Sequence, residues 1–142
     1  MEGSNQRDSF AGSRLFVYGT LRRGFRSHGF LQQLHARFLA TARVRGRLYD
    51  LGEYPGAVES AGSTDRVAGE LYFLPRPLEA FRILDKFEGC NTARPAFNLF
   101  DRKRAAVTVA GGREVRAWIY WLAQRRIIGR CISSGNYAAR RT

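Results

Sequence analysis

The feature that most constrains the fold is the stretch "VTVAGGREVRAWIYW", from Val107 to Trp121, in which two alternating runs flank a pair of glycines. Alternation of apolar and polar residues with a period of two is typical of a β-strand that buries one face. Gly111 and Gly112 can adopt the positive φ angles that a tight hairpin turn requires. The stretch therefore predicts an antiparallel β-hairpin.

Strand-like segments dominate the rest of the chain as well, since they are rich in β-branched or aromatic residues or alternate in polarity. With the hairpin they give predicted strands at Arg14–Tyr18, Phe38–Asp50, Arg66–Leu74, Asn98–Ala110 and Glu114–Leu122. Two helices are expected, one near Phe25–His35 and one from about Pro77 to Phe87, where Pro75 and Pro77 mark the start. The pattern predicts an α+β domain that closes, or nearly closes, into a small barrel.

The length of 142 residues and the 44% of hydrophobic residues are enough for one domain with a proper core. Residues 1–12 are polar and lack the apolar run of a signal peptide or membrane span. We therefore expect a flexible tail over residues 1–12, a single domain over residues 13–142, no membrane segment and a cytoplasmic location. Cys90 and Cys131 have neither CxxC spacing nor the density of a disulfide scaffold, which fits a reducing compartment.

The formal net charge of +12 raises the possibility of an anionic partner such as nucleic acid. Almost all of the positive charge is arginine, however, and it is scattered from Arg7 to Arg141 rather than gathered in one basic helix or arm. Charge distributed in this way often only keeps a surface solvated. Nucleic-acid binding is therefore not expected to be the main role.

The second predicted helix, "PLEAFRILDKFEG", carries a carboxylate on its apolar side. At 100° per residue Phe81, Leu84 and Phe87 share one face, and Glu88 projects from that face at the end closed by Gly89. Burial and the negative end of the helix dipole both raise the pKa of such a carboxyl group. Glu88 is therefore a candidate general acid–base residue.

Two alternatives to this assignment stay open at the level of periodicity. The helix can end one residue earlier, so that Glu88 turns into solvent or pairs with an arginine. Asp85, at the edge of the apolar face, is a second candidate acid that is expected to lie nearer water.

Four segments in order, "VYGTLRRG", "GRLYDLGEYPG", "GELY" and "LDKFEG", resemble the γ-glutamylcyclotransferase-like family, in particular its γ-glutamylamine cyclotransferase type. The similarity continues through "VRAWIYW" to "SSGNY" and covers roughly Leu15 to Tyr137. It implies a small mixed β-barrel with flanking helices and release of 5-oxoproline from γ-glutamyl compounds. It also implies that Glu88 is the general acid–base residue. Phe100 and Asn136 stand where many relatives have Tyr and Asp, which leaves the substrate open.

The resemblance places the substrate-binding loop at Tyr18, Gly19, Thr20 and Leu21. Successive backbone N–H groups in a tight turn that contains glycine can converge on an anion, here the α-carboxylate of the substrate. An ordinary strand-to-loop turn is the alternative.

Several residues near this loop or facing the expected pocket are secondary candidates. Arg22, Arg23 and Arg26 are candidates for the pocket rim, or else form a solvated surface. Tyr120 is expected to face the barrel interior together with Trp118, while Ile119 and Trp121 face the other way. We take Tyr120 as a packing residue, with pocket lining as the alternative. His28 and His35 have no visible catalytic partner and are taken as surface or packing residues.

The implied reaction is an intramolecular attack of the α-amine on the side-chain carbonyl group, which one carboxyl group can serve as base and then as acid. It calls for no metal and no cofactor, and the only partner expected is a small γ-glutamyl molecule. The alternative function is a non-catalytic module that binds a γ-glutamyl group or another small anion on the same fold. The leaving amine and the oligomeric state cannot be read from the sequence.

Overall fold

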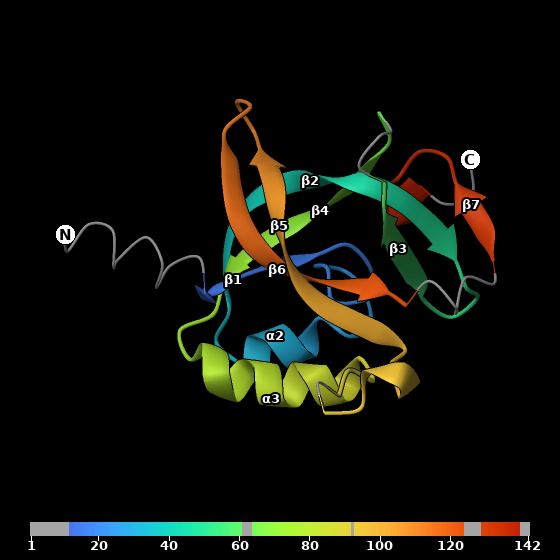
Figure 1. Ribbon diagram of the computed structural model, residues 1–142. Coiled ribbons are helices and arrows are strands. Elements are labelled where there is room, and N and C mark those ends of the chain that lie inside the picture. Colours follow the sequence, from blue (N-terminus) through green and yellow to red (C-terminus); the bar gives the residue numbers. More distant parts are fainter. Residues whose placement is uncertain (1–11, 61–63, 92, 124–128, 140–142) are drawn as a thin grey trace.

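The computed structural model describes residues 12–60, 64–91, 93–123 and 129–139 (Figure 1). Its strands are β1 (Arg14–Val17), β2 (Arg37–Asp50), β3 (Pro55–Glu59), β4 (Arg66–Phe73), β5 (Phe100–Val109), β6 (Glu114–Leu122) and β7 (Arg130–Ile132). Its helices are α2 (Gly29–Gln33) and α3 (Pro77–Phe87), with short 3-10 turns η1 (Pro95–Phe97) and η3 (Tyr137–Ala139). The tail predicted over residues 1–12 falls almost wholly on residues 1–11, outside the described ranges.

Five strands close into a barrel in the order β2, β4, β1, β6, β5, because β5 pairs back onto β2. The β1–β6 pair is parallel, and the other barrel pairs are antiparallel. The length of β2 lets its first part pair with β4 and β5, while residues 46–50 pair with β3 and β7. The prediction of a small mixed β-barrel with short helices is confirmed.

The predicted hairpin is present, with Gly111 at φ 92° and Gly112 at φ 87°. The five predicted strands are all found, with ends that differ by at most two residues. The helix predicted over Phe25–His35 is only Gly29–Gln33, because the residues before it form turns in which Ser27 donates to the Thr20 carbonyl group over 3.0 Å. Strands β3 and β7 were not predicted.

Two apolar clusters occupy the two faces of the barrel wall. One cluster draws alternate residues from all five barrel strands and fills the interior; it includes Ile119 and Trp121 of β6. The other lies outside the wall, where α2 and α3 cover it, and includes Tyr120, with Trp118 packed against it. The predicted orientation of these four residues is therefore wrong, because both faces of β6 are apolar and the alternation does not say which one faces inward.

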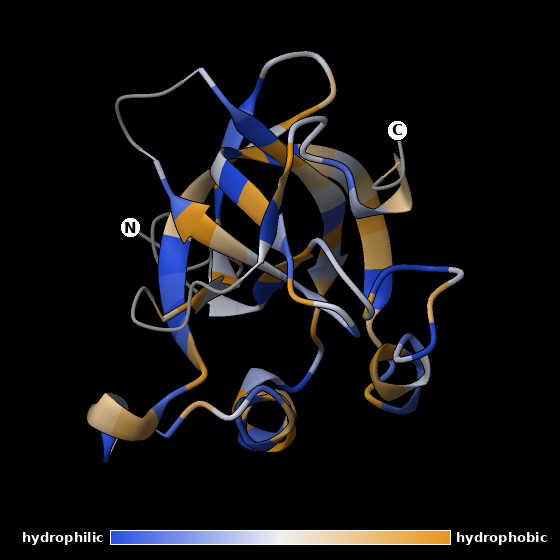
Figure 2. Ribbon diagram, turned by 90° about the vertical axis from the view of Figure 1, so that its right-hand side faces the viewer, coloured by the Kyte–Doolittle hydropathy of each residue, from blue (hydrophilic) through white to orange (hydrophobic). Residues whose placement is uncertain are grey.

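Helices α2 and α3 lie side by side against the outer face of the barrel, below the strands in Figure 1, and the rings of Phe30 and Phe87 are 4.5 Å apart between centroids. Figure 2 shows apolar and polar residues alternating along the barrel strands, as the sequence pattern requires. Helix α3 buries Ala80, Phe81 and Leu84 against the outer face of the barrel. Within the described ranges, no helix has both the length and the apolar character needed to cross a membrane.

Candidate active site

A cavity of about 250 Å³ lies between the turn after β1 and the end of α3. Its wall consists of Phe16, Val17, Tyr18, Gly19, Thr20, Leu21, Arg26, Ser27, Tyr54, Pro55, Phe87, Glu88, Leu99, Phe100 and Tyr120. The structure thus brings the predicted loop, Tyr18 to Leu21, together with Glu88 and Tyr120 at one cavity. Glu88 and Arg26 are the two charged residues among those that line it.

Tyr18 fixes the start of the turn. Its buried hydroxyl group donates to the carbonyl oxygen of Tyr120 over 2.6 Å and accepts from the N–H of Ala57 over 3.1 Å. Gly19 follows, and a Cβ atom at that position would lie 2.7 Å from Cγ of Pro55. Glycine is therefore required at residue 19 by the close approach of the proline ring, not by a positive φ angle.

The turn itself is held by its carbonyl groups. The carbonyl oxygen of Gly19 accepts from the N–H of Arg22 over 3.1 Å, and that of Thr20 accepts from the N–H of Ser27 over 3.0 Å. The N–H groups of Gly19, Thr20 and Leu21 have no acceptor within the described part of the chain. Such a run of consecutive amides in a tight turn is a feature of anion-binding sites in proteins.

Glu88 lies at the end of α3, where its N–H donates to the Leu84 carbonyl group over 2.8 Å and Gly89 follows with φ 64°. The helix therefore ends at the predicted position, and the Glu88 side chain is half-buried in the cavity wall. Burial, and secondly the nearby charge of Asp85, raise the pKa of Glu88 from its ordinary 4.5 to about 8. Glu88 can thus take up and release a proton near neutral pH.

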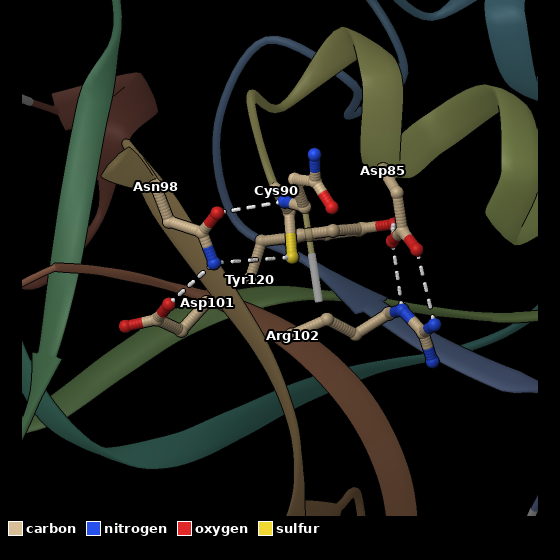
Figure 3. Close-up of polar contacts among 7 residues, drawn as sticks. Asp85, Cys90, Asn98, Asp101, Arg102 and Tyr120 are labelled. Carbon is tan, nitrogen blue, oxygen red and sulfur yellow. Dashed lines mark hydrogen bonds and ion pairs between the residues drawn. The ribbon is translucent and has the colours of Figure 1, made fainter. Parts of the chain in front are cut away.

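Asp85, the alternative acid, is tied to neighbouring side chains (Figure 3). Arg102 donates to its carboxylate twice, over 2.8 Å from Nε and 3.1 Å from Nη2, and Tyr120 donates to it over 2.6 Å. Its side chain is 19% exposed, and its carboxylate is held by these three hydrogen bonds. It does not line the cavity.

Arg22 and Arg23, the predicted rim residues, are not among the residues that line the cavity. Arg22 lies 3.6 Å from Glu70 and donates to Asn136 over 2.9 Å, and the guanidinium group of Arg23 stacks 3.9 Å from the ring centroid of Phe38. These partners, on β4, near the C-terminal end and on β2, draw both arginines away from the cavity.

Arg26, named with the other two arginines in the sequence interpretation, does line the cavity, with an exposed side chain that donates to the carbonyl group of Glu53. His28 packs, as expected, since its ring contacts Tyr72 and its Nδ1 lies 2.9 Å from the carbonyl oxygen of Leu21.

Sequence reasoning missed one wall of the cavity. Tyr54 precedes β3 and Pro55 is its first residue, and the short "PGAVE" run of β3 has no alternation. Leu99 precedes β5 and Phe100 is its first residue. The only available signal for Tyr54 and Pro55 was their place in the "GRLYDLGEYPG" segment, one of the four segments that carry the family resemblance.

The cavity thus combines a turn with unpaired amides, a feature of anion-binding sites, and a carboxyl group of raised pKa, and it is the candidate active site. Comparison with known proteins gives the family. The model of the family described as "Gamma-glutamyl cyclotransferase, AIG2-like" matches residues 15–139. The chain belongs to this family.

Similar proteins and structures are consistent with that assignment. A putative γ-glutamylcyclotransferase of Vibrio cholerae is 32% identical over 89% of this chain and 96% of its own length. The γ-L-glutamyl-butirosin B γ-glutamyl cyclotransferase of Niallia circulans is 35% identical over 75% of this chain and 64% of its own length. The crystal structure of an AIG2-like protein from Mus musculus superposes with a TM-score of 0.65 at 27% identity, over 78% of this chain and 77% of that one.

Proposed function

We propose that the protein is a γ-glutamyl cyclotransferase that releases 5-oxoproline from a small γ-glutamyl amine, amide or isopeptide. The observation that carries the proposal is the position of Glu88 at the same cavity as the Tyr18–Leu21 turn, together with its pKa of about 8. The family assignment and the names of the relatives support it.

In the proposed complex the turn holds the α-carboxylate of the γ-glutamyl group. The free amides of Gly19, Thr20 and Leu21 are the donors, and the absent side chain of Gly19 leaves the turn close against Pro55. Because one end of the γ-glutamyl group is anchored there, the α-amine and the γ-carbonyl carbon can be folded toward each other. Attack within one molecule then needs no second reactant to be captured.

Glu88 moves the protons in the proposed mechanism. As the carboxylate it takes a proton from the α-ammonium group, and the free amine attacks the γ-carbonyl carbon to close the five-membered ring. As the carboxylic acid it then gives the proton to the departing nitrogen while the C–N bond breaks. The carboxylate formed again takes the second proton from the ring nitrogen and passes it to the expelled amine, which leaves as an ammonium ion. An α-ammonium group has a pKa of about 8 in model peptides, so a carboxyl group with a pKa of about 8 is well matched to both steps.

The leaving amine lies in the remainder of the cavity in this proposal. That part is formed by aromatic and aliphatic residues, Tyr54, Phe87, Leu99 and Phe100, with the exposed Arg26 beside them. The relative from Niallia circulans is named for a γ-glutamyl derivative of butirosin B. A range of γ-glutamyl amines is therefore the appropriate set of trial substrates.

The test is to incubate the purified protein with γ-glutamyl amines, γ-glutamyl amino acids and a γ-glutamyl isopeptide and to measure 5-oxoproline by mass spectrometry. We expect product from at least one substrate class with the unchanged protein and a loss of at least about 10²-fold with Glu88→Gln, since general acid–base groups contribute on this scale. Glu79→Gln, on the exposed side of the same helix, is the matched control and should retain activity. Binding of these compounds without any product would instead identify a binding module.

A further inference from the structure

The polar network behind Glu88 is not used by the proposed reaction, although it is one of the most strongly bonded clusters in the described part of the chain. Asp85 accepts three hydrogen bonds, two from Arg102 and one from the hydroxyl group of Tyr120 (Figure 3). Asp85 stands on α3 three residues before Glu88, while Arg102 is on β5 and Tyr120 on β6. The network thus ties the helix that carries Glu88 to two barrel strands.

Arg102 is held rigidly in this network. Its guanidinium group lies 4.3 Å from the ring centroid of Phe81 and 4.6 Å from that of Trp118, and its side chain is only 17% exposed. A planar cation that stacks on aromatic rings and binds a carboxylate through two nitrogens has little freedom to leave. It therefore balances the charge of Asp85 at a fixed place.

Tyr120 connects the network to the cavity. Tyr120 is one of the residues that line the cavity, while its hydroxyl group donates to Asp85 and its carbonyl oxygen accepts from Tyr18. Tyr120 therefore offers the substrate a fixed ring. A substitution of Asp85 can therefore alter the cavity wall in two ways, through the position of Tyr120 and through the end of α3.

From this geometry we propose that Asp85 is a positioning residue: it holds the Tyr120 ring against the cavity, and its charge, balanced by Arg102, controls how readily Glu88 takes up a proton. This inference rests on the proposed function of Glu88. It assigns a task to the "LDKFEG" aspartate and to Arg102 that the reaction itself does not require.

Few charged or titratable groups face Glu88, so the effect of Asp85 on its titration can be measured separately from theirs. Tyr18 at the end of β1 and Tyr120 on β6 both interact with Glu88, and burial raises the pKa of each hydroxyl group far above neutrality, so both stay uncharged. Arg26 lines the same cavity with an exposed side chain. Asp85 is the neighbour whose negative charge opposes ionisation of Glu88.

The experiment measures the titration of Glu88 directly, without substrate, so that it does not depend on finding a turnover reaction. The carboxyl carbon of Glu88 is followed by NMR in protein labelled with ¹³C at glutamate, and the signal is assigned by its absence in Glu88→Gln. We expect Asp85→Asn to lower the midpoint by about one pH unit, the size that a neighbouring charge ordinarily produces. Arg102→Met, which leaves Asp85 charged and uncompensated, should raise it.

The matched control is Asp65→Asn, which removes the carboxylate of another arginine–aspartate pair, Arg47 and Asp65 at 2.9 Å, on the exposed surface away from the cavity. It should leave the Glu88 midpoint unchanged. If both network variants fold and neither moves the midpoint, or both move it in the same direction, the inference is wrong. If Asp85→Asn does not fold, Arg102→Met decides the matter by the direction of its shift.

A kinetic readout separates this role from a merely structural one when a substrate is in hand. Activity should rise with pH as Glu88 ionises, and in Asp85→Asn this rise should move to lower pH by the same amount as the NMR midpoint. A structural defect alone would lower kcat without moving the profile. Absence of turnover in every variant would count against the proposed function and leave the NMR result intact.

Discussion

Replacement of Glu88 by glutamine should make the protein more stable, and the size of the gain can be worked out from the titration of this residue. Its pKa is about 8 in the folded protein, against an ordinary 4.5. Below pH 4.5 the carboxyl group is protonated in both states and has no effect. As pH rises from there toward 8, the unfolded chain releases a proton that the folded protein keeps, so stability falls; above pH 8 the loss is constant.

Each pH unit between the two pKa values costs about 1.4 kcal/mol, so at pH 7 the penalty is at most about 3.4 kcal/mol. The Glu88 side chain is half-buried, and partial contact with solvent screens the effect to about 2 kcal/mol. Glutamine has the shape of the protonated acid and carries no charge, so it removes this penalty. In a domain of this size the gain corresponds to a rise in Tm of about 6 °C.

The assay is urea denaturation of the unchanged protein and Glu88→Gln at pH 4 and pH 7, with Glu79→Gln as control. We expect equal stabilities at pH 4 and a more stable Glu88→Gln at pH 7. The control replaces a glutamate on the same helix whose side chain is 60% exposed, and it should change stability by less than about 0.5 kcal/mol at either pH. A Glu88→Gln protein that gains nothing between pH 4 and pH 7 would refute the claim that burial holds the proton on Glu88.

Three further substitutions test the surroundings of the cavity. Gly19→Ala places a methyl group 2.7 Å from Cγ of Pro55, so the turn must move, and KM for the γ-glutamyl substrate should rise about tenfold or more; an unchanged KM would show that the turn does not hold the substrate. Tyr18→Phe removes both hydrogen bonds of a buried hydroxyl group and should cost about 1–3 kcal/mol in urea denaturation, whereas no cost would contradict the assigned bonds. Arg22→Met leaves Glu70, only 6% exposed, without its cation and should cost about 3 kcal/mol in the same assay; a neutral result would mean that the pair is not stabilising.

The barrel could be predicted from the sequence because the signals for its strands are local. A period of two over eight or more residues and a Gly-Gly pair at the turn need no knowledge of the rest of the chain, and β5, β6 and their turn follow from them. Strand β3 begins with Pro55 and Gly56 and becomes a strand only because β2 pairs with it. A strand that forms because a neighbouring strand pairs with it has no alternating pattern of its own in the sequence.

The same difference between local and long-range signals applies to the candidate site. Glu88 could be found because a carboxylate on an apolar helix face is an anomaly within one short segment. The polar partners of the residues around the site could not be found from the sequence, because they are far apart along the chain. Glu70 accepts from the N–H of Arg23 over a separation of 47 residues, and the hydroxyl group of Tyr120 donates to Asp85 over a separation of 35. Such pairs exist only once the barrel has closed.

Part of the arginine excess also has a structural explanation that the composition did not suggest. Arg23, Arg37, Arg102 and Arg104 each lie over an aromatic ring, at 3.9 to 5.0 Å from a ring centroid. Guanidinium groups pack on aromatic rings while keeping their charge, which lysine does less well. These arginines therefore contribute to packing on the outer surface of the barrel.

The central claim is that the Tyr18–Leu21 turn and Glu88 hold one γ-glutamyl group between them. A crystal structure of Glu88→Gln with an intact γ-glutamyl amine tests it most directly, because this variant should bind the substrate without consuming it. We expect the α-carboxylate within about 3 Å of the amide nitrogens of Gly19, Thr20 and Leu21, and the α-amine facing residue 88. A γ-glutamyl group bound elsewhere, or bound in this cavity with its α-amine turned away from residue 88, would contradict the claim.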